Sequence, residues 1–336
     1  MPKLMEPDGR PRLMAASGQG APSGEAEALR FALEIAKHRQ HPLFVWSMLN
    51  QEVDHGCAHA LREKFTQVGA EGLSHLDVLI QSPGGDINAA YRCIRFFRRK
   101  ANTLTFLIPF WTKSAATFMA LGADEILMGE EAELGPLDAQ VGDGAGSRRP
   151  LSALNQFKSL EAIRTFSVET LGILTDFFES AYGMDLPYAL DRAQSMTGDF
   201  SGALYSQVPP RDLGQYARHL GVAEEYARRV MSRWSYTDRS ASEIDSIVRR
   251  LVFSYPAHDF NIDLDEARAI GLKAAPMDPE LDRLSWELVQ RAPLFDLVLP
   301  PPSTTESPAP KSTNGRRRSV EPAATGGEGA AEDART

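Results

Sequence analysis

Two short segments of the chain carry the residue types that acyl-transfer chemistry needs. Ser82-Pro83-Gly84-Gly85 follows one apolar run, and Lys113-Ser114-Ala115-Ala116 opens another. Acyl transfer uses a nucleophilic hydroxyl together with backbone N–H groups that stabilise the negative oxygen of the intermediate. Between them, the two segments offer both kinds of group.

The first segment has the composition of a tight turn between a strand and a helix. Pro83 fixes one backbone angle, while Gly84 and Gly85 permit backbone conformations that other residues avoid. The helix predicted to begin near Asp86 points the positive end of its dipole at the same place. We therefore expect the N–H groups of this turn to form half of an oxyanion hole.

The second segment also joins an apolar run to a predicted helix. Ser114 falls in the first helical turn between small residues, which let a substrate carbonyl approach closely, and the Ala115 N–H offers a second oxyanion donor. Each segment alone has an ordinary structural explanation, a plain turn in the first case and a helix cap in the second. Their combination makes Ser114 the candidate nucleophile.

The sequence around these segments alternates between apolar runs and amphipathic helices. Residues 43–46 form a short apolar run, and we predict strands at 76–81, 104–110 and 125–128 and helices at 50–65, 86–100 and 114–122. Strands that alternate with helices in this way are typical of an α/β fold.

The pattern of the sequence changes to long helical segments after residue 151, and its composition changes near both ends. We expect a disordered N-terminal tail (1–25), an α/β core (26–151), a helical insertion (152–250), a C-terminal part of the core (251–299) and a disordered C-terminal tail (300–336). The tails are rich in Gly, Ala, Ser and Pro and carry too little apolar surface to offset the entropy of ordering.

Composition excludes several classes of function. The 336 residues carry a formal net charge of −9, which argues against nucleic-acid binding through net electrostatics. The two cysteines, Cys57 and Cys93, cannot form a disulfide framework, and no Cys/His spacing indicates a metal site. No apolar stretch resembles a signal peptide or a membrane span. We expect a cytoplasmic protein without metal or cofactor.

Three runs of sequence closely resemble one family. They are 76–85, 113–126 and 133–140, and in this order and spacing they resemble the serine dehydrogenase proteinases. That family consists of presumed serine peptidases related to the Clp protease proteolytic subunit and to signal peptide peptidases. The resemblance covers about residues 40–140 and resumes at 255–260 and 266–272. It implies a ClpP/crotonase-like spiral of β-β-α units, peptide or protein substrates, and assembly into homo-oligomers.

The resemblance also implies roles for individual residues. Ser114 matches the nucleophile, and Gly85 and Ala115 match the oxyanion donors, with Gly84 in the same turn. The histidine that follows the nucleophile in the Clp subunit has no counterpart at the corresponding distance in this chain. The general base is therefore not given by the motif.

Three residues remain as candidates for the general base. Signal peptide peptidases use a lysine downstream of the serine as base, and Lys158 lies within the comparable stretch of this chain; a desolvated lysine can act as a base. His258 is the second candidate, with Asp138 or Asp259 as the orienting carboxylate. Lys113 is the least favoured, because adjacent helical residues point about 100° apart; we expect it to contact substrate or solvent.

We interpret the chain as a serine-type endopeptidase that hydrolyses peptide bonds through an acyl-enzyme on Ser114. A catalytically impaired, ClpP-like oligomeric scaffold is the alternative, because the histidine is missing and the helical insertion could bind a partner. Crotonase-like acyl-CoA chemistry is a third possibility, since it uses the same oxyanion architecture. The presence of Ser114, which that chemistry does not need, argues against it.

Overall fold

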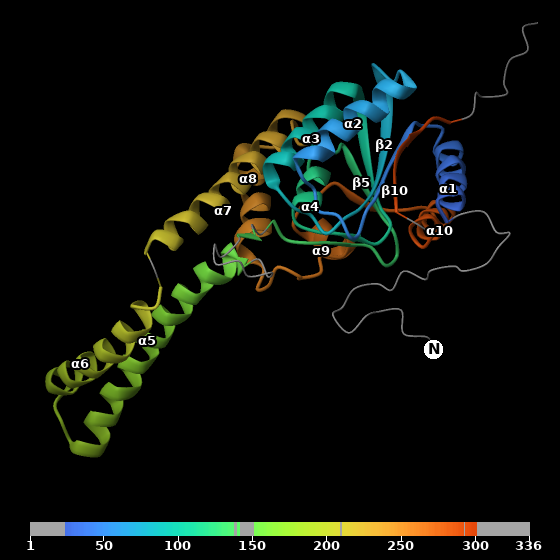
Figure 1. Cartoon of the computed structure of the whole chain (residues 1–336). Helices are drawn as coiled ribbons and strands as arrows, with labels where there is room; N and C mark the ends of the chain where they lie inside the picture. The colour runs from blue at the N-terminus through green and yellow to red at the C-terminus, as the bar shows by residue number, and fades with distance from the viewer. Residues whose placement is uncertain (1–23, 138–139, 142–150, 209, 292, 301–336) are drawn as a thin grey trace, which may run out of the picture. The chain divides into compact units, whose positions relative to one another are not determined.

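A mostly parallel sheet lies at the centre of the fold. The computed structural model describes residues 24–137, 140–141, 151–208, 210–291 and 293–300. Within them, a six-stranded sheet has the order β10-β1-β2-β3-β5-β9, and only the β10–β1 pair is antiparallel (Figure 1). The predicted α/β fold is confirmed.

The strands are short. Those of the large sheet are β1 (Leu43–Ser47), β2 (Leu73–Gln81), β3 (Ala101–Ile108), β5 (Glu125–Met128), β9 (Ala274–Pro276) and β10 (Leu294–Val298). Two further pairs are β4 (Trp111–Thr112) with β6 (Glu133–Leu134), and β7 (Gln140–Val141) with β8 (Leu151–Ser152).

Helices flank the strands along the chain. They are α1 (Gly24–Arg39), α2 (His55–Val68), α3 (Ile87–Lys100), α4 (Ala115–Ala120), α5 (Ala153–Tyr182), α6 (Leu186–Tyr205), α7 (Pro210–Val230), α8 (Ala241–Arg249), α9 (Leu264–Ala269) and α10 (Pro279–Val289). The π-helical turns η1 (Met231–Ser235) and η2 (Arg250–Ser254) directly follow α7 and α8.

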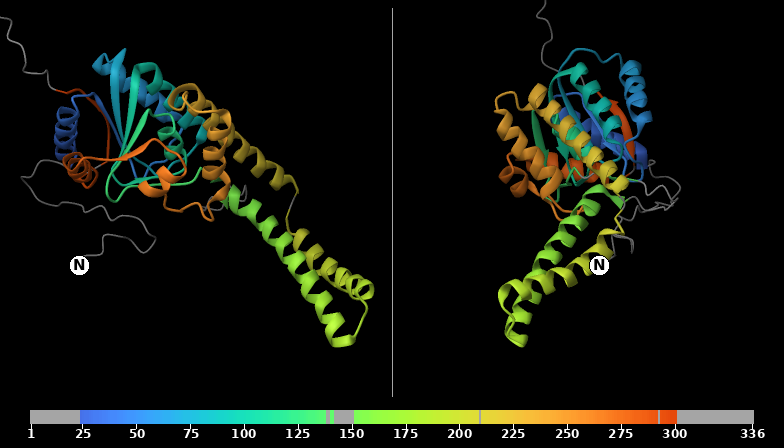
Figure 2. Two further views of the ribbon diagram at one scale, coloured as in Figure 1. Left: turned by 180° about the vertical axis from the view of Figure 1, so that it is seen from behind. Right: turned by 90° about the vertical axis from the view of Figure 1, so that its left-hand side faces the viewer.

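Both faces of the sheet are covered, which explains why its strands are continuous apolar runs. In β1, Phe44 and Trp46 join one apolar cluster, whereas Leu43 and Val45 join the cluster on the opposite face. Helices α1 and α10 pack together on the second face (Figure 2). Helices α2, α3 and α4 supply the first, larger cluster.

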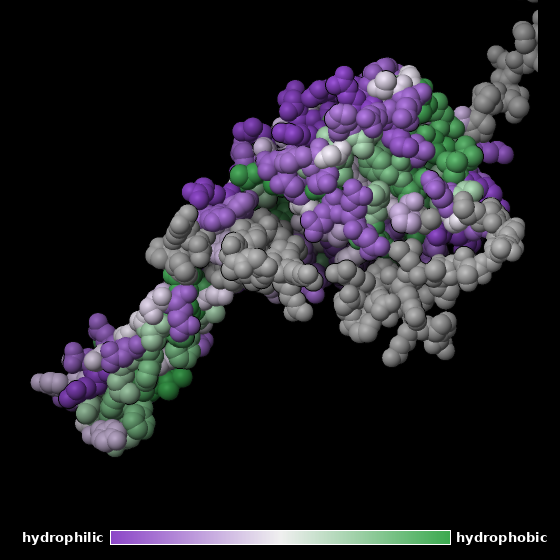
Figure 3. All heavy atoms as spheres, viewed as in Figure 1, coloured by the Kyte–Doolittle hydropathy of each residue, from purple (hydrophilic) through white to green (hydrophobic). Residues whose placement is uncertain are grey.

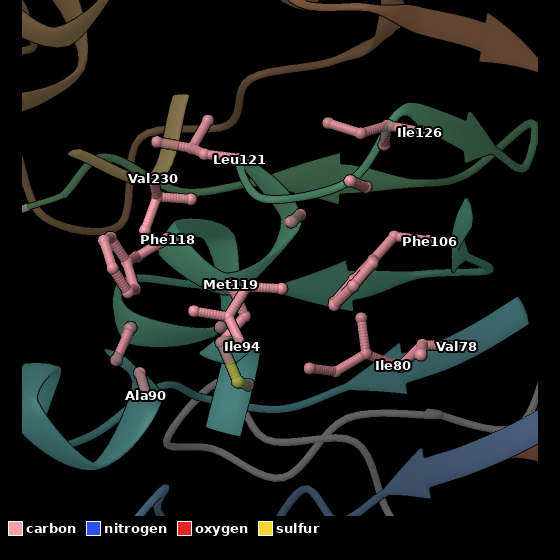
Figure 4. Close-up of a cluster of buried hydrophobic side chains, with 14 of the residues drawn as sticks. Val78, Ile80, Ala90, Ile94, Phe106, Phe118, Met119, Leu121, Ile126 and Val230 are labelled. Atoms are coloured by element: carbon pink, nitrogen blue, oxygen red, sulfur yellow. The ribbon is translucent and has the colours of Figure 1, made fainter. Parts of the chain in front are cut away.

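The larger cluster fixes the position of α4, the helix that begins after Ser114. Figure 4 shows Met119 of α4 between Phe118, which lies near Val230 of α7, and the sheet residues Phe106 and Ile80. All five side chains are almost completely buried. A close-packed core of this kind holds the start of α4 rigidly against the ends of β2 and β3.

Helix α2 begins later than the sequence pattern predicts. Residues 50–65 were expected to be helical, but the helix starts after Asp54, whose carboxylate accepts the Cys57 N–H at 3.1 Å. An aspartate in this cap position satisfies an N–H group that the helix itself cannot. Gly69, in a left-handed conformation, ends the helix.

The segment predicted as a helical insertion is helical throughout most of its described residues. Helices α5 and α6 pack side by side, and Figure 3 shows apolar side chains at the surface of this pair. Val230 of α7 and Val248 of α8 belong to the same cluster as the sheet. The division of the chain at residues 152 and 250 stays a prediction. Across the described residues, we find no helix with the length and apolar character of a membrane span.

Candidate active site

The two chemistry-bearing segments run side by side where β2 and β3 end. The Ser82 N–H donates to the Trp111 carbonyl at 3.1 Å, and the Lys113 N–H donates to the Ser82 carbonyl at 3.1 Å. These bonds form a parallel bridge between Ser82 and Thr112. Carboxyl ends of parallel strands meet at one edge of a sheet, which is where α/β proteins place their sites.

Gly84 lies directly against Ser114. Its φ of +96° is a conformation that other residues rarely adopt, and a Cβ built on it would lie 2.6 Å from the Lys113 carbonyl oxygen and 2.8 Å from the Ser114 Cβ. Only glycine fits here. The Gly84 N–H donates to the Ser82 Oγ at 3.2 Å, so it is already engaged within the turn.

Gly85 is held by the segment that precedes α2. The Val53 N–H donates to the Gly84 carbonyl at 2.7 Å, and the Asp86 N–H donates to the Val53 carbonyl at 2.8 Å. In such a parallel bridge the bonds to Val53 come from the neighbours of Gly85, whose own N–H points to the opposite side. Gly85 itself is exposed.

Ser114 has a strained backbone. Its φ of 49° and ψ of −117° lie outside the conformations that L-residues ordinarily adopt. The residue is half-buried, and its side chain does not cap α4, which begins at Ala115. The interpretation of Ser114 as an ordinary helix cap therefore fails. Strained strand-to-helix turns of this kind present the nucleophile in many acyl-transfer enzymes.

Lys113 turns inward rather than toward solvent. The residue is 5% exposed, and its Nζ lies 2.8 Å from the Glu133 Oε1, 2.9 Å from the Asn261 Oδ1 and 3.4 Å from the Leu134 carbonyl oxygen. The expectation that this side chain contacts solvent was wrong. Burial lowers the pKa of Lys113, and the hydrogen bond and charge of Glu133 offset part of that effect.

The two favoured base candidates meet at one segment, residues 255–261. The Lys158 Nζ donates to the Tyr255 carbonyl at 2.9 Å, and His258, with a buried Nδ1, lies within the segment. Asn261 of the same segment accepts the bond from Lys113, the residue before Ser114. Hydrogen bonds thus connect the segment 255–261 both to Lys158 and to Lys113, the residue before the candidate nucleophile Ser114.

Asp138 and Asp259 are the two candidate carboxylates for orienting His258. Asp138 lies outside the described residues. The negative charge of Asp259 acts on Lys113 and raises its pKa, although by less than burial lowers it. The role of either carboxylate in catalysis stays a prediction.

One cluster that sequence reasoning missed lies at the opposite end of β2. Among the described residues, His41, His75 and Asp77 form the group that has metal-binding geometry. The Arg39 Nε donates to the fully buried Asp77 carboxylate at 2.8 Å and neutralises it, and the two imidazoles stack 3.7 Å apart. We interpret this group as a structural anchor. In the sequence, the feature that could have indicated this cluster is Asp77, a single aspartate inside an apolar run.

Comparison with known proteins covers part of the chain. Two uncharacterized proteins of Methanocaldococcus jannaschii, MJ0137 and MJ1495, are 36% and 34% identical over 67 residues, which is 20% of this chain and 23% of each relative. Among solved structures, a mutant of the 1510-N membrane-bound stomatin-specific protease gives a TM-score of 0.28 at 13% identity. That match covers 44% of this chain and 68% of the other.

A family model matches the part of the chain that holds the site. The match spans residues 70–177, and the family is described as ClpP-like SDH-type serine proteinase. It includes both the glycine turn and Ser114. The resemblance inferred from the sequence motifs is therefore confirmed, and residues 70–177 carry the pattern of the ClpP-like SDH-type serine proteinases.

Proposed function

We propose that this protein is a serine peptidase in which Ser114 attacks the carbonyl carbon of a peptide bond. One observation carries the proposal: Ser114 holds a strained backbone conformation at the start of α4 and packs directly against the Gly84 turn. Strain of this kind persists only when the surroundings impose it, and it is concentrated at functional sites. The family match over residues 70–177 supports the same chemistry.

In this proposal, Gly85 and Ala115 stabilise the oxyanion. The Gly85 N–H points away from Val53, and Ala115 opens α4, where backbone N–H groups have no partner within the helix. Gly84 instead has a packing role, because its N–H already donates to the Ser82 Oγ. Two fixed donors in a partly dry site stabilise a developing negative charge far better than water does.

We assign the role of general base to Lys158. Lys113 is the poorer candidate, because its Nζ is ion-paired with Glu133 and also donates to Asn261 and to the Leu134 carbonyl, so it is committed to structural contacts. The Nζ of Lys158 instead contacts a single backbone carbonyl, that of Tyr255, at 2.9 Å. His258 is the alternative base.

The reaction then proceeds in two halves. Lys158 takes the proton from the Ser114 hydroxyl as its oxygen bonds to the peptide carbonyl carbon, and the C=O electron pair moves onto the oxygen held by the two N–H groups. Collapse of this intermediate breaks the C–N bond, and the amine leaves with the proton from Lys158. Water, deprotonated by the same lysine, attacks the acyl-enzyme, releases the acid and restores Ser114.

Labelling with a fluorophosphonate probe tests the nucleophile. We expect the wild-type protein to be labelled and the Ser114→Ala variant to remain unlabelled, with hydrolysis of fluorescent casein lost in parallel. Ser242→Ala is the matched control, because this serine is exposed and lies near the start of α8. An unlabelled wild type, or equal labelling of Ser114→Ala, would refute the proposal. Loss of casein hydrolysis in Ser114→Ala would also exclude a non-catalytic scaffold.

Two substitutions test the base. We expect Lys158→Met to lower the rate of fluorophosphonate labelling by about 10²–10⁴-fold, the usual contribution of a general base. His258→Gln should keep the rate within about threefold, because a group that does not transfer the proton adds little to this step. The opposite ranking would assign the base to His258. His219→Gln serves as the control for loss of a histidine elsewhere.

Peptide or protein substrates, a homo-oligomeric assembly and a cytoplasmic location remain proposals drawn from the family resemblance. Separating the native protein by size with light scattering would test the assembly directly. A monomer at micromolar concentration would count against it.

A further inference from the structure

Lys113 joins three parts of the chain that are distant in sequence. Its main chain precedes Ser114, its Nζ binds Glu133 and the Leu134 carbonyl of β6, and it also binds Asn261 of the segment 255–261. The proposed reaction does not use this ammonium group. Burial of a lysine is costly unless its charge is paired. Here Glu133 pairs with the charge, and two further acceptors surround the ammonium group.

We propose that Lys113 and Asn261 are positioning residues that hold the segment 255–261 at a fixed distance from Ser114. This inference rests on the proposed peptidase function. The Tyr255 carbonyl of this segment accepts a hydrogen bond from the Lys158 Nζ, so in the proposed reaction the placement of the segment orients the lysine that acts as base on Ser114. The Lys113 ammonium thereby connects the Ser114 segment to the segment 255–261.

The residues around Lys113 restrict its side chain to the conformation that contacts Asn261. A Cβ on Gly135 would lie 2.7 Å from the Lys113 Cδ, so the lysine stem is packed tightly against a residue without a side chain. Leu134 and Ile262 exchange two backbone hydrogen bonds of 2.9 and 3.0 Å, which bring β6 beside the segment. The ammonium therefore has little freedom to move.

The Lys113–Asn261 bond is the part of this arrangement that can be removed most cleanly. Asn261 is exposed, so its replacement leaves no cavity in the core. The backbone pair between Leu134 and Ile262 remains and preserves the fold of this region. What changes is how precisely the segment is held near Ser114.

The experiment compares Asn261→Leu with Asn261→Asp in fluorophosphonate labelling. Leucine cannot accept the Lys113 hydrogen bond, whereas aspartate can. We expect Asn261→Leu to lower kinact, the labelling rate at saturating probe, by about 10–100-fold, because a misplacement of about 1 Å can have that effect. KI, the probe concentration at half-saturation, and Tm should stay unchanged. Asn261→Asp should keep kinact within about threefold.

Three results would overturn the proposal. An unchanged kinact in Asn261→Leu would show that the contact does not position the base. An equal loss in both variants would show that the accepted hydrogen bond is not what matters. A loss that follows a lowered Tm would show that the role is only structural.

Lys113→Met provides a second test. It should lower kinact at least as much as Asn261→Leu, and adding Glu133→Gln, which removes the unpaired charge, should restore Tm but not kinact. Lys273→Met is the matched control, because Lys273 binds Asp238 and the Ser235 carbonyl but no residue of the site. Recovery of kinact in the double variant would refute positioning by Lys113.

The two proposals fail in different ways. If the wild type is not labelled at Ser114, the peptidase function fails. If the wild type is labelled and the Asn261 and Lys113 variants label equally fast, only the positioning role fails.

Discussion

At Ser114, a single residue adopts a conformation that its own chemistry disfavours. Residues in sparsely populated backbone regions cost about 1–3 kcal/mol each. The turns on both sides hold it there, since the Ala116 N–H donates to the Lys113 carbonyl and the Phe118 N–H donates to the Ser114 carbonyl, both at 2.9 Å. Gly84 allows this arrangement because any side chain there would occupy the same space.

A Gly84→Ala variant tests that statement. We expect it to lose labelling at Ser114 and to lower the free energy of unfolding, because the added methyl would meet the Lys113 carbonyl oxygen at 2.6 Å. Gly72→Ala is the control, since Gly72 also has a positive φ, +60°, but has nothing within 4 Å of the added Cβ. Gly84→Ala should be about 1–3 kcal/mol less stable than the control in urea unfolding. Equal stability would contradict the packing argument.

At the scale of elements, the end of α1 is fastened to the sheet by a buried ion pair. Arg39 is the last residue of α1, and its side chain donates to Asp77 of β2 at 2.8 Å. Burial alone would raise the pKa of Asp77, but hydrogen bonds from His75 and Arg39 and the charge of Arg39 outweigh it and lower the pKa. Burial lowers the pKa of His41, so this imidazole favours its neutral form.

An Asp77→Asn variant should therefore be destabilised in a pH-dependent way. Removing one partner of a buried pair costs about 3 kcal/mol near neutral pH. Because the pKa of Asp77 is lowered in the folded state, its contribution is present above the ordinary value of 3.8 and disappears as the pH falls through the lowered pKa. The stability difference from the wild type should thus narrow below pH 3.8.

Urea unfolding of both proteins from pH 7 to pH 3 measures this difference. Asp238→Asn is the control, because this exposed carboxylate also pairs with a cation, Lys273, yet solvent screens the pair. A constant gap between the wild type and Asp77→Asn over the whole range would contradict the assignment.

The sequence predicted elements well where the pattern was local. Strand β5 has the predicted bounds, 125–128, because a short apolar run stands between polar neighbours. Helix α3 begins near Asp86 and ends at Lys100 as predicted, and the Asp86 carboxylate accepts the Ala89 N–H at its cap. The start of α2 was wrong by several residues, since apolar periodicity does not register the stronger cap at Asp54.

The residues of the candidate site were likewise predictable only where the pattern was local. Ser114 and the glycine turn were found because each motif is contiguous, and the fold brings the two together. The contacts of Lys113 were not predicted, because its partners Glu133 and Asn261 lie 20 and 148 residues further along the chain, and the motifs do not indicate which residues pair. No local pattern encodes a contact of that range.

On the scale of the whole molecule, the sheet separates two apolar clusters, and the site lies at one edge of it. Phe44 and Val45, adjacent in β1, belong to different clusters, so a register shift by one residue would exchange the two faces. Parallel strands also require long crossover connections. The site therefore collects residues from segments that are far apart along the chain.

The bond between Lys113 and Asn261 has a consequence for the kinetics of folding. It closes a loop of 148 residues, and contacts of such range form late, after local helices that appear within microseconds. On dilution from urea, far-UV circular dichroism should recover first, and fluorophosphonate reactivity at Ser114 should follow in a slower phase. Simultaneous recovery would show that the site forms early. In the expected order, a newly made chain passes through an interval in which its helices are formed but Ser114 is not yet reactive.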